Sequence, residues 1–225
     1  MILRHPNGRG KLFDESEVSI RSHLSRDSAA AGQCQIQDSR IQDGSVVAGS
    51  ARVFGGKFIR TYIGGNIVIA GHPYAEHSIL TGSNITGYPS LINAVVKDGA
   101  QVSDSAIIIG AGIDHPIVIA GNASIYGTAV LIGGFTVSGQ ARIESGIWTR
   151  APRYINLGYA SVTESKLGAM VECRNRTTAY WNRHGAKLGE RMGYTANQIK
   201  EILETINYLA GNALNYNEVD DQGFA

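Results

Sequence analysis

The stretch GNASIYGTAVLIGGFTVSGQARIESG, residues 121–146, repeats a pattern with a period of six residues. Its bulky aliphatic residues stand six positions apart, at Ile125, Leu131, Val137 and Ile143. Alanine stands two positions before three of them, and glycine stands two positions after three of them. A period of six fits neither the 3.6 residues of a helical turn nor the two-residue alternation of a long strand. It fits short strands separated by tight corners, which is the signature of a parallel β-helix.

The same spacing occurs earlier in the chain. Residues 38–59 carry aliphatic side chains at Ile41, Val47, Val53 and Ile59, and residues 99–110 add Val102 and Ile108. We expect the aliphatic residue to point into the core and the small residue before it to fill a cramped inward position. Glycine, asparagine or aspartate then suits the corner, because these residues adopt the left-handed backbone conformation at low cost.

The period is broken at two places that are candidates for functional loops. Residues 70–94 contain Pro73 and Pro89 and show irregular spacing, and residues 111–117 contain Pro116. We expect these breaks to be corners widened by insertions or loops that leave the stack.

The chain divides by pattern into four parts: an N-terminal cap (1–30), a parallel β-helix (31–172), a C-terminal helical segment (173–213) and a tail (214–225). In the helical segment, Thr195 and Gln198 form a capping-box pattern that opens a helix at 196–210, with Gly211 as its stop. A second, shorter helix is expected at 178–191. The glycines that lower its helical propensity are Gly185 and Gly189.

The composition of the chain limits which kinds of partner, compartment and metal site are expected. The net charge is +1 and charged residues make up 17% of the chain, which is not the balance of a dedicated nucleic-acid binder. No apolar run approaches bilayer length, so we expect no membrane insertion and a cytoplasmic location. The two cysteines, Cys34 and Cys173, are too far apart in sequence to suggest a disulfide framework or a classical zinc cluster.

The repeats in residues 30–165 resemble those of the left-handed parallel β-helix proteins with hexapeptide repeats. They are also similar to a bacterial and phage branch with GNAxVxG repeats and a short helical C-terminus, often described as transferases. The resemblance implies an all-β solenoid, a single-stranded left-handed parallel β-helix with a C-terminal α-helical segment, assembled as a homotrimer. Many members of the superfamily are acyltransferases that use acyl-CoA. The asparagine- and proline-rich tail that closes such coils around CoA has no counterpart in this sequence.

If the protein is an acyltransferase, it needs a general base to deprotonate a hydroxyl or amine. His115 lies beside Asp114 in one of the breaks, where such a base would sit at a cleft between subunits. The alternative is that His115 is a solvent-exposed loop residue.

His72 and His77 suggest a different chemistry. Their His-x4-His spacing on a β-helix resembles the zinc-binding pattern of gamma-class carbonic anhydrases, although the third histidine of that family has no match upstream. His115, about two coils further along the chain, is the candidate for the third zinc ligand in its place. A zinc-dependent lyase is therefore a third hypothesis.

Aromatic and arginine side chains gather in two stretches near the end of the β-rich part, a composition typical of interface hot spots and nucleotide pockets. The candidate binding residues are Trp148, Arg150, Arg153, Tyr154, Tyr180, Trp181, Arg183 and His184. Packing between a loop and the helices is the alternative role.

Two classes of function stay open. The first is a non-enzymatic oligomeric scaffold or binding protein, without a cofactor, that uses its loops and C-terminal helices to hold a small-molecule or protein ligand. The second is an acyl-CoA-dependent acyltransferase acting at a cleft between subunits. The first is preferred, because fold alone does not license an activity.

Overall fold

The computed structural model describes residues 3–217, with side chains up to residue 211. The chain forms two compact units. The first contains the described residues up to 139 together with 144–151, and the second contains 140–143 together with the residues from 152 onward.

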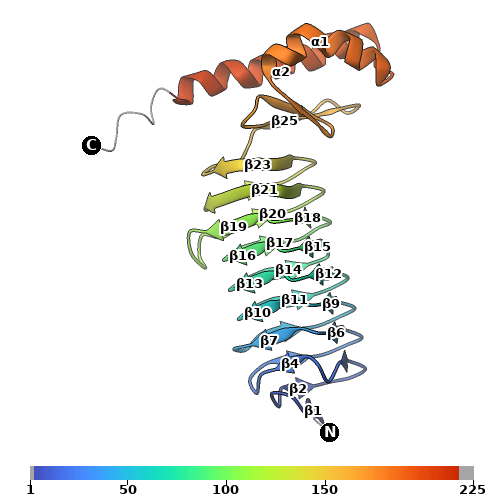
Figure 1. Cartoon of the computed structure of the whole chain (residues 1–225), viewed down its shortest axis with the longest axis vertical. Helices are drawn as coiled ribbons and strands as arrows, with labels where there is room; N and C mark the ends of the chain where they lie inside the picture. The colour runs from blue at the N-terminus through green and yellow to red at the C-terminus, as the bar shows by residue number, and fades with distance from the viewer. Residues whose placement is uncertain (1–2, 218–225) are drawn as a thin grey trace, which may run out of the picture. The chain divides into compact units, whose positions relative to one another are not determined.

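The first unit is a parallel β-solenoid in which each coil contributes three short strands (Figure 1). One face is a nine-stranded sheet made of β1 (Leu3–Arg4), β2 (Lys11–Leu12), β5 (Ala29–Ala30), β8 (Val46–Val47), β11 (Tyr62–Gly64), β14 (Ile79–Thr81), β17 (Ala94–Val96), β20 (Ile117–Ile119) and β22 (Thr136–Val137).

The other two faces belong to one fourteen-stranded sheet that turns a corner through the long strand β21 (Ser124–Gly133). One side holds β3 (Glu17–Val18), β6 (Gln35–Gln37), β9 (Arg52–Phe54), β12 (Val68–Gly71), β15 (Asn84–Gly87) and β18 (Gln101–Val102). The other side, which we call the third face, holds β4 (His23–Leu24), β7 (Arg40–Gln42), β10 (Lys57–Ile59), β13 (Tyr74–Glu76), β16 (Ser90–Ile92) and β19 (Ile107–Gly110), and β23 (Arg142–Trp148) pairs with β21.

The predicted inward residues form the core with one exception: Ile59 is only half-buried, and Phe58, one position earlier, takes the inward place. Ile125 and Leu131 have no exposed surface, and Val137 and Ile143 are each 2% exposed. The alanines before Ile125, Leu131 and Ile143 are buried too. At Ser45, the small residue before Val47, the buried hydroxyl donates to the carbonyl of Gln42 at 2.7 Å and so has a hydrogen-bond partner. The predicted fold class is confirmed: the structure is a parallel β-solenoid with C-terminal helices and matches a left-handed β-helix.

The corners follow the predicted chemistry where glycine occupies them. Gly127 has φ +65°, and a Cβ atom there would lie 2.4 Å from the carbonyl oxygen of Glu144 in the next coil. A side chain at this corner would therefore be excluded by both backbone conformation and space.

Residues 70–94 do not leave the stack, which corrects the expectation of widened corners or loops. They form the whole of β13, β14, β15 and β16, the end of β12 and the start of β17. The inward residues Ala75, Leu80 and Ile85 follow one another at intervals of five, so the corners are shortened. Tyr74 pairs with Ser90, so the coil here is two residues shorter than three full hexapeptides, whereas the coil from Lys57 to Tyr74 is one residue shorter.

The break at 111–117 is a true insertion. Ser90 pairs with Ile107, and Ile107 in turn pairs with Val130, so the second of these two coils is the longer one by a whole hexapeptide. The additional residues form the loop between β19 and β20.

The ends of the solenoid differ from the predicted boundaries. Parallel pairing already begins within the expected cap of residues 1–30, where β2 pairs with β5 and β3 with β6. At the other end, the residues after 152 form an antiparallel sheet in the second unit, although the β-helix was expected to reach 172. Residues 154–156 and 161–164 pair in antiparallel register, and in the turn between them the amide of Leu157 donates to the carbonyl of Ala160 at 2.9 Å, so the chain reverses instead of continuing the coil.

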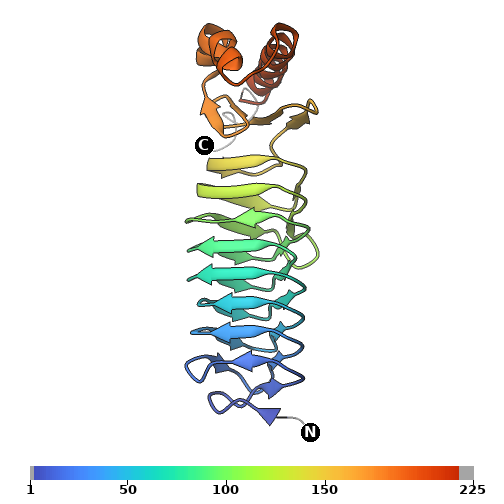
Figure 2. The ribbon, with the colours of Figure 1, turned by 90° about the vertical axis from the view of Figure 1, so that its right-hand side faces the viewer.

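The second unit packs two helices on this sheet (Figure 2). Its elements are β24 (Tyr154–Asn156), β25 (Ser161–Glu164), β26 (Ala169–Val171), β27 (Arg174–Arg176), α1 (Thr178–Arg191) and α2 (Ala196–Asn217). The predicted bounds of α1 are confirmed, and so is the capping box, since Thr195 N donates to Gln198 Oε1 at 2.8 Å. The predicted stop at Gly211 is wrong, because α2 continues to Asn217 and so includes the start of the expected tail. The rest of that tail, 218–225, lies outside the described residues.

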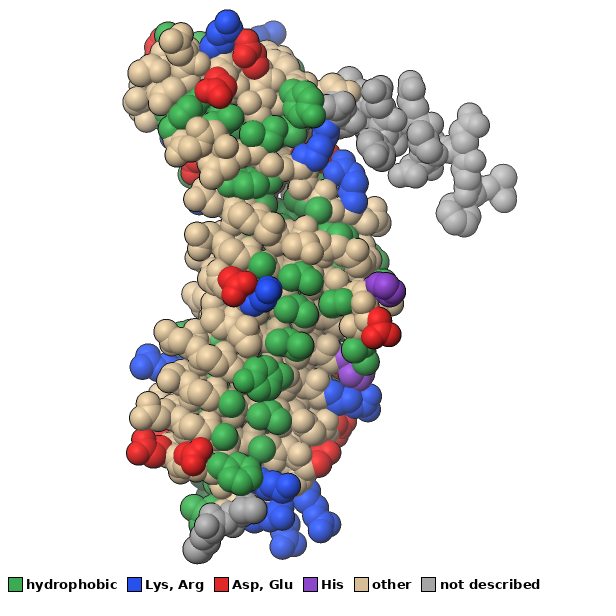
Figure 3. Space-filling model, turned by 180° about the vertical axis from the view of Figure 1, so that it is seen from behind, with side chains coloured by type: hydrophobic (Ala, Val, Ile, Leu, Met, Phe, Trp, Pro, Cys, Tyr) green, Lys and Arg blue, Asp and Glu red, His purple; other side chains and the backbone are tan. Residues whose placement is uncertain are grey.

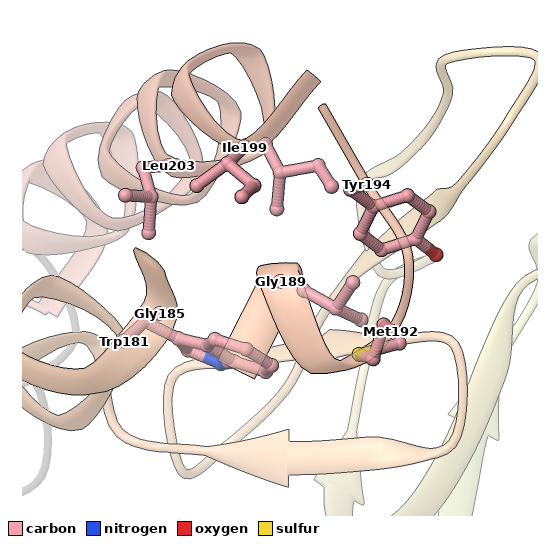
Figure 4. Close-up of a pocket in the computed structure, with 9 residues that line it drawn as sticks. Trp181, Gly185, Gly189, Met192, Tyr194, Ile199 and Leu203 are labelled. Atoms are coloured by element: carbon pink, nitrogen blue, oxygen red, sulfur yellow. The ribbon is translucent and has the colours of Figure 1, made fainter. Parts of the chain in front are cut away.

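The glycines of α1 allow the two helices to approach closely. A Cβ atom at Gly185 would lie 2.6 Å from Leu203 Cδ2, and one at Gly189 would lie 2.6 Å from Ile199 Cγ1. Between the helices remains an apolar cavity of about 10 Å³, lined also by Trp181 (Figure 4). These glycines, which weaken an isolated helix, are therefore explained by packing.

Neither helix is long and apolar enough, within the part of the chain that the structure describes, to cross a membrane.

Candidate functional site

The two histidines of the zinc hypothesis lie at successive corners of the solenoid, separated by β13. His72 is exposed, with its ring 5.6 Å from that of Tyr88. His77 Nε2 lies 2.9 Å from an Arg60 guanidinium nitrogen, a cation where a metal would bind. Among the described residues, no group of three potential ligand side chains could hold a metal ion. The geometry gives the zinc hypothesis no support.

His77 nevertheless belongs to a cluster of polar side chains at the edge of the third face. The His77 cluster consists of Lys57, Arg60, Tyr74, Glu76 and His77. Because Arg60 donates to Nε2, the imidazole proton lies on Nδ1, 3.7 Å from Glu76 Oε1. The Tyr74 hydroxyl donates to Glu76 Oε2 at 2.5 Å, and this hydrogen bond is the main cause that raises the pKa of Tyr74. A histidine oriented by a carboxylate is the arrangement that general-base catalysis uses.

His115 has no such support. It lies in the inserted loop and is exposed, and its backbone groups bond only within the loop, to Ala111 and Gly112. Within residues 3–217, neither ring nitrogen of His115 has a hydrogen-bond partner. Its role as a base stays a prediction without an orienting group.

Of the candidate binding residues, two belong to the first unit. Trp148 is 2% exposed and its indole donates to the carbonyl of Ser145 at 3.0 Å. Arg150 is half-buried and donates to the carbonyl of Ala151. Trp148 is therefore a packing residue, contrary to its predicted place on a contact surface.

Three more candidates lie in the second unit, and two of them hold it together. Trp181 is buried in the core and donates to the carbonyl of Ala169 at 2.9 Å. Arg153 pairs with Glu164 at 3.3 Å and donates to the carbonyl of Leu209, which ties the sheet to α2. The buried hydroxyl of Tyr154 has no hydrogen-bond partner within the described residues. Trp181 and Arg153 therefore serve packing, which was the alternative role.

The remaining candidates, Tyr180, Arg183 and His184, are exposed on α1. The Tyr180 ring lies 4.8 Å from that of His184, and the Arg176 guanidinium lies 5.5 Å from the Tyr180 ring centre. The helical spacing places further cations on the same side of α1. We call this surface the α1 basic face; its residues are Arg174, Arg176, Tyr180, Arg183, His184, Lys187 and Arg191.

The α1 basic face carries unbalanced charge. It holds five arginine and lysine side chains, all exposed, and Glu190 is the acidic residue that α1 contributes. Within the described residues none of the five forms an ion pair. Arg176 makes a cation–π contact with Tyr180.

Sequence reasoning missed Lys187 and Arg191, although their four-residue spacing from Arg183 was a readable signal. It also missed a column on the third face of the solenoid, in which His23, Arg40 and Lys57 pair in register. These residues recur once per coil, at intervals of 17 residues, and a search for a six-residue period does not detect that interval.

No protein-family model and no curated protein sequence matches the chain. Among solved structures, the chain is similar to a UDP-N-acetylglucosamine acyltransferase from Campylobacter jejuni, with 12% sequence identity and a TM-score of 0.26. The match covers 91% of this chain and 85% of the other. At this identity and TM-score, the likeness assigns no activity to the chain.

Proposed function

We propose that the protein is a binding protein that recognises an acidic protein partner through the α1 basic face. The observation that carries this proposal is the exposed stack of Arg176, Tyr180 and His184, surrounded by cations that no ion pair neutralises within the described residues. Tyrosine and arginine are the residues that most often anchor protein interfaces. The solenoid then serves as a rigid support.

A charge-specific peptide assay tests this proposal. Fluorescence anisotropy should show binding of a labelled hexaglutamate peptide that weakens with salt, and no binding of hexalysine. Binding should fall in the triple variant Arg176→Gln/Arg183→Gln/Arg191→Gln. It should persist in a control with the same charge change in the first unit, Arg4→Gln/Arg26→Gln/Arg52→Gln. Equal loss in both variants, or tighter binding of oligothymidine than of hexaglutamate, would refute an acidic protein partner.

A second candidate function is acyl transfer, and the Glu76–His77 arrangement favours it. If Arg60 moves aside, His77 Nε2 accepts the proton of an acceptor hydroxyl or amine. The acceptor oxygen or nitrogen forms the new bond to the acyl carbon, the carbon–sulfur bond of acyl-CoA breaks, and the proton passes to the leaving thiolate. The hexapeptide-repeat resemblance supplies acyl-CoA as the donor.

Thiol release measures this reaction directly. Acetyl-CoA with a panel of amino and hydroxyl acceptors should release free CoA, and His77→Gln should abolish the release. His115→Gln is the matched control and should leave the rate unchanged; the reverse pattern would assign the base to His115. Absence of thiol release together with no thermal shift at millimolar acetyl-CoA would exclude this candidate.

For the assembly, we propose a homotrimer joined through the outward side of the nine-stranded sheet. Hydrophobic side chains run along this face (Figure 3). They pair in register from coil to coil as Val46, Tyr62, Ile79, Val95 and Val118, and Ile79 is 47% exposed. In this column Tyr62 and Ile79 are exposed and the three valines are half-buried, and an apolar column at the surface is typical of a protein interface.

Light scattering on the purified protein should give the mass of three chains. Ile79→Asp should produce monomers without changing the circular dichroism spectrum. A monomeric wild-type protein would refute the trimer.

A further inference from the structure

A polar hollow of about 540 Å³ opens on the first unit near its N-terminal end. Its lining comes from the turn between β1 and β2 and from the corners before β4 and β7. The residues that line it are Asn7, Arg21, His23, Asp38, Ser39, Arg40 and Gln42. All seven are polar or charged, which is unusual for a pocket of ligand size, since such pockets are mostly apolar.

The floor of the hollow is held in place by hydrogen bonds. The Ser39 hydroxyl donates to the carbonyl of Gln37 at 2.7 Å and accepts from the amide of Gly55. Asn7 donates its side-chain amide to the carbonyl of Ser22 at 3.0 Å. A built polar floor, with these groups already satisfied, reduces the entropy that a ligand would lose on binding.

The same contacts fix the state of His23. Because Asn7 Nδ2 donates to Ser22, its Oδ1 faces His23 Nδ1 at 3.2 Å, so the proton of the neutral imidazole lies on Nδ1. The other ring nitrogen, Nε2, has no hydrogen-bond partner in the described part of the chain. It is available as an acceptor for a ligand hydroxyl.

The charged groups of the hollow are not paired with one another. Arg21, Arg40 and Asp38 form no ion pair within residues 3–217, although they line one hollow. Two guanidinium groups present fork-shaped donor sets that match a phosphate or carboxylate. Asp38 offers an acceptor for hydroxyl groups, and Gln42 offers both a donor and an acceptor.

We propose that this hollow is a binding site for a phosphorylated small molecule that carries hydroxyl groups. Arg21 and Arg40 hold the phosphate, while Asp38 and His23 accept hydrogen bonds from the hydroxyl groups. The lining of the hollow shares no residue with the α1 basic face or with the His77 cluster, although Arg40 pairs in register with Lys57 of that cluster.

Calorimetric titration of the full-length protein with ribose 5-phosphate, ribose and inorganic phosphate tests the site. Ribose 5-phosphate should bind saturably and more tightly than either of the other two probes. Arg40→Gln should weaken its binding about tenfold or more, the loss expected for one charge-assisted hydrogen bond. Arg52→Gln, an exposed arginine on β9, should leave the affinity unchanged.

Asp38→Asn separates the two halves of the site. Removing the carboxylate should narrow the preference for ribose 5-phosphate over inorganic phosphate, because the amide accepts hydroxyl groups less strongly than the carboxylate. Circular dichroism confirms that each variant is folded. The proposal is overturned if none of the three probes reaches saturation at about 10 mM, which would mean a dissociation constant in the millimolar range or weaker. It is also overturned if Arg40→Gln and Arg52→Gln bind ribose 5-phosphate with the same affinity.

Discussion

Close packing of α1 on α2 predicts that glycine-to-alanine substitutions at Gly189 and Gly185 differ in their effect on stability. In an exposed helix, such a change stabilises by about 1 kcal/mol through helical propensity. At Gly189 the new methyl group would lie 2.6 Å from Ile199 Cγ1 and 3.0 Å from its Cδ1. Overpacking of this kind costs about 1–3 kcal/mol. The net loss expected for Gly189→Ala, after the gain in propensity is subtracted, is therefore about 1 kcal/mol.

Gly185 faces a neighbour that can move more easily. Its new methyl group would meet Leu203 Cδ2, the end of a flexible side chain, and the next atom of Leu203 lies 3.6 Å away. Leu203 also lines the small cavity between the helices. A rotation of Leu203 relieves the contact, whereas the β-branched Ile199 is stiff about its first side-chain torsion. Gly185→Ala should therefore leave the stability of the second unit nearly unchanged.

Gly211→Ala is the control substitution, because its new methyl group meets no neighbouring atom and only helical propensity changes. Gly211 lies in α2, it is exposed, and a Cβ atom there would meet nothing within 4 Å. Urea unfolding followed by circular dichroism at 222 nm reports on the helices, which belong to the second unit. The expected order of unfolding midpoints is Gly211→Ala above Gly185→Ala above Gly189→Ala. If Gly189→Ala unfolds at or above the wild-type midpoint, the packing argument is wrong.

Three further measurements probe other contacts. Burial, with a hydrogen bond to a carboxylate, raises the pKa of Tyr159 from 10.0 to about 12, so its stabilising contribution is complete below pH 10 and is lost as pH rises toward 12; Tyr159→Phe should flatten that loss in pH-dependent unfolding. Glu164→Gln leaves Arg153 without its charge partner and should lower the stability of the second unit by about 1–3 kcal/mol in urea unfolding, unless the pair contributes nothing. Gly127→Ala should lower the melting temperature more than Gly44→Ala does, because both glycines have positive φ but only Gly127 faces the backbone of the next coil; equal effects would mean that backbone conformation alone matters.

The inward positions of the solenoid could be predicted from the sequence because side-chain volume and spacing determine them. Ile125 and Leu131 are examples, and both are fully buried. The shortened corners could not be predicted, because the residues that turn them are not typical corner residues. Arg60 and His77 adopt positive φ, 49° and 48°, where glycine or asparagine would be expected. In the sequence, an interval of five residues between inward positions therefore looks like a break in the six-residue pattern.

The length of a coil decides which outward side chains meet, and this is why candidate sites were harder to predict than the core. Inward residues need only the local interval of five or six, whereas outward residues become neighbours at intervals of a whole coil. His23, Arg40, Lys57 and Tyr74 share one column because three successive coils have the same shortened length. If each coil were three full hexapeptides, these residues would be offset by one position on neighbouring strands and, since side chains alternate, would point to opposite sides. The corner residues that shorten the coils thus also place the charged groups of the outer faces.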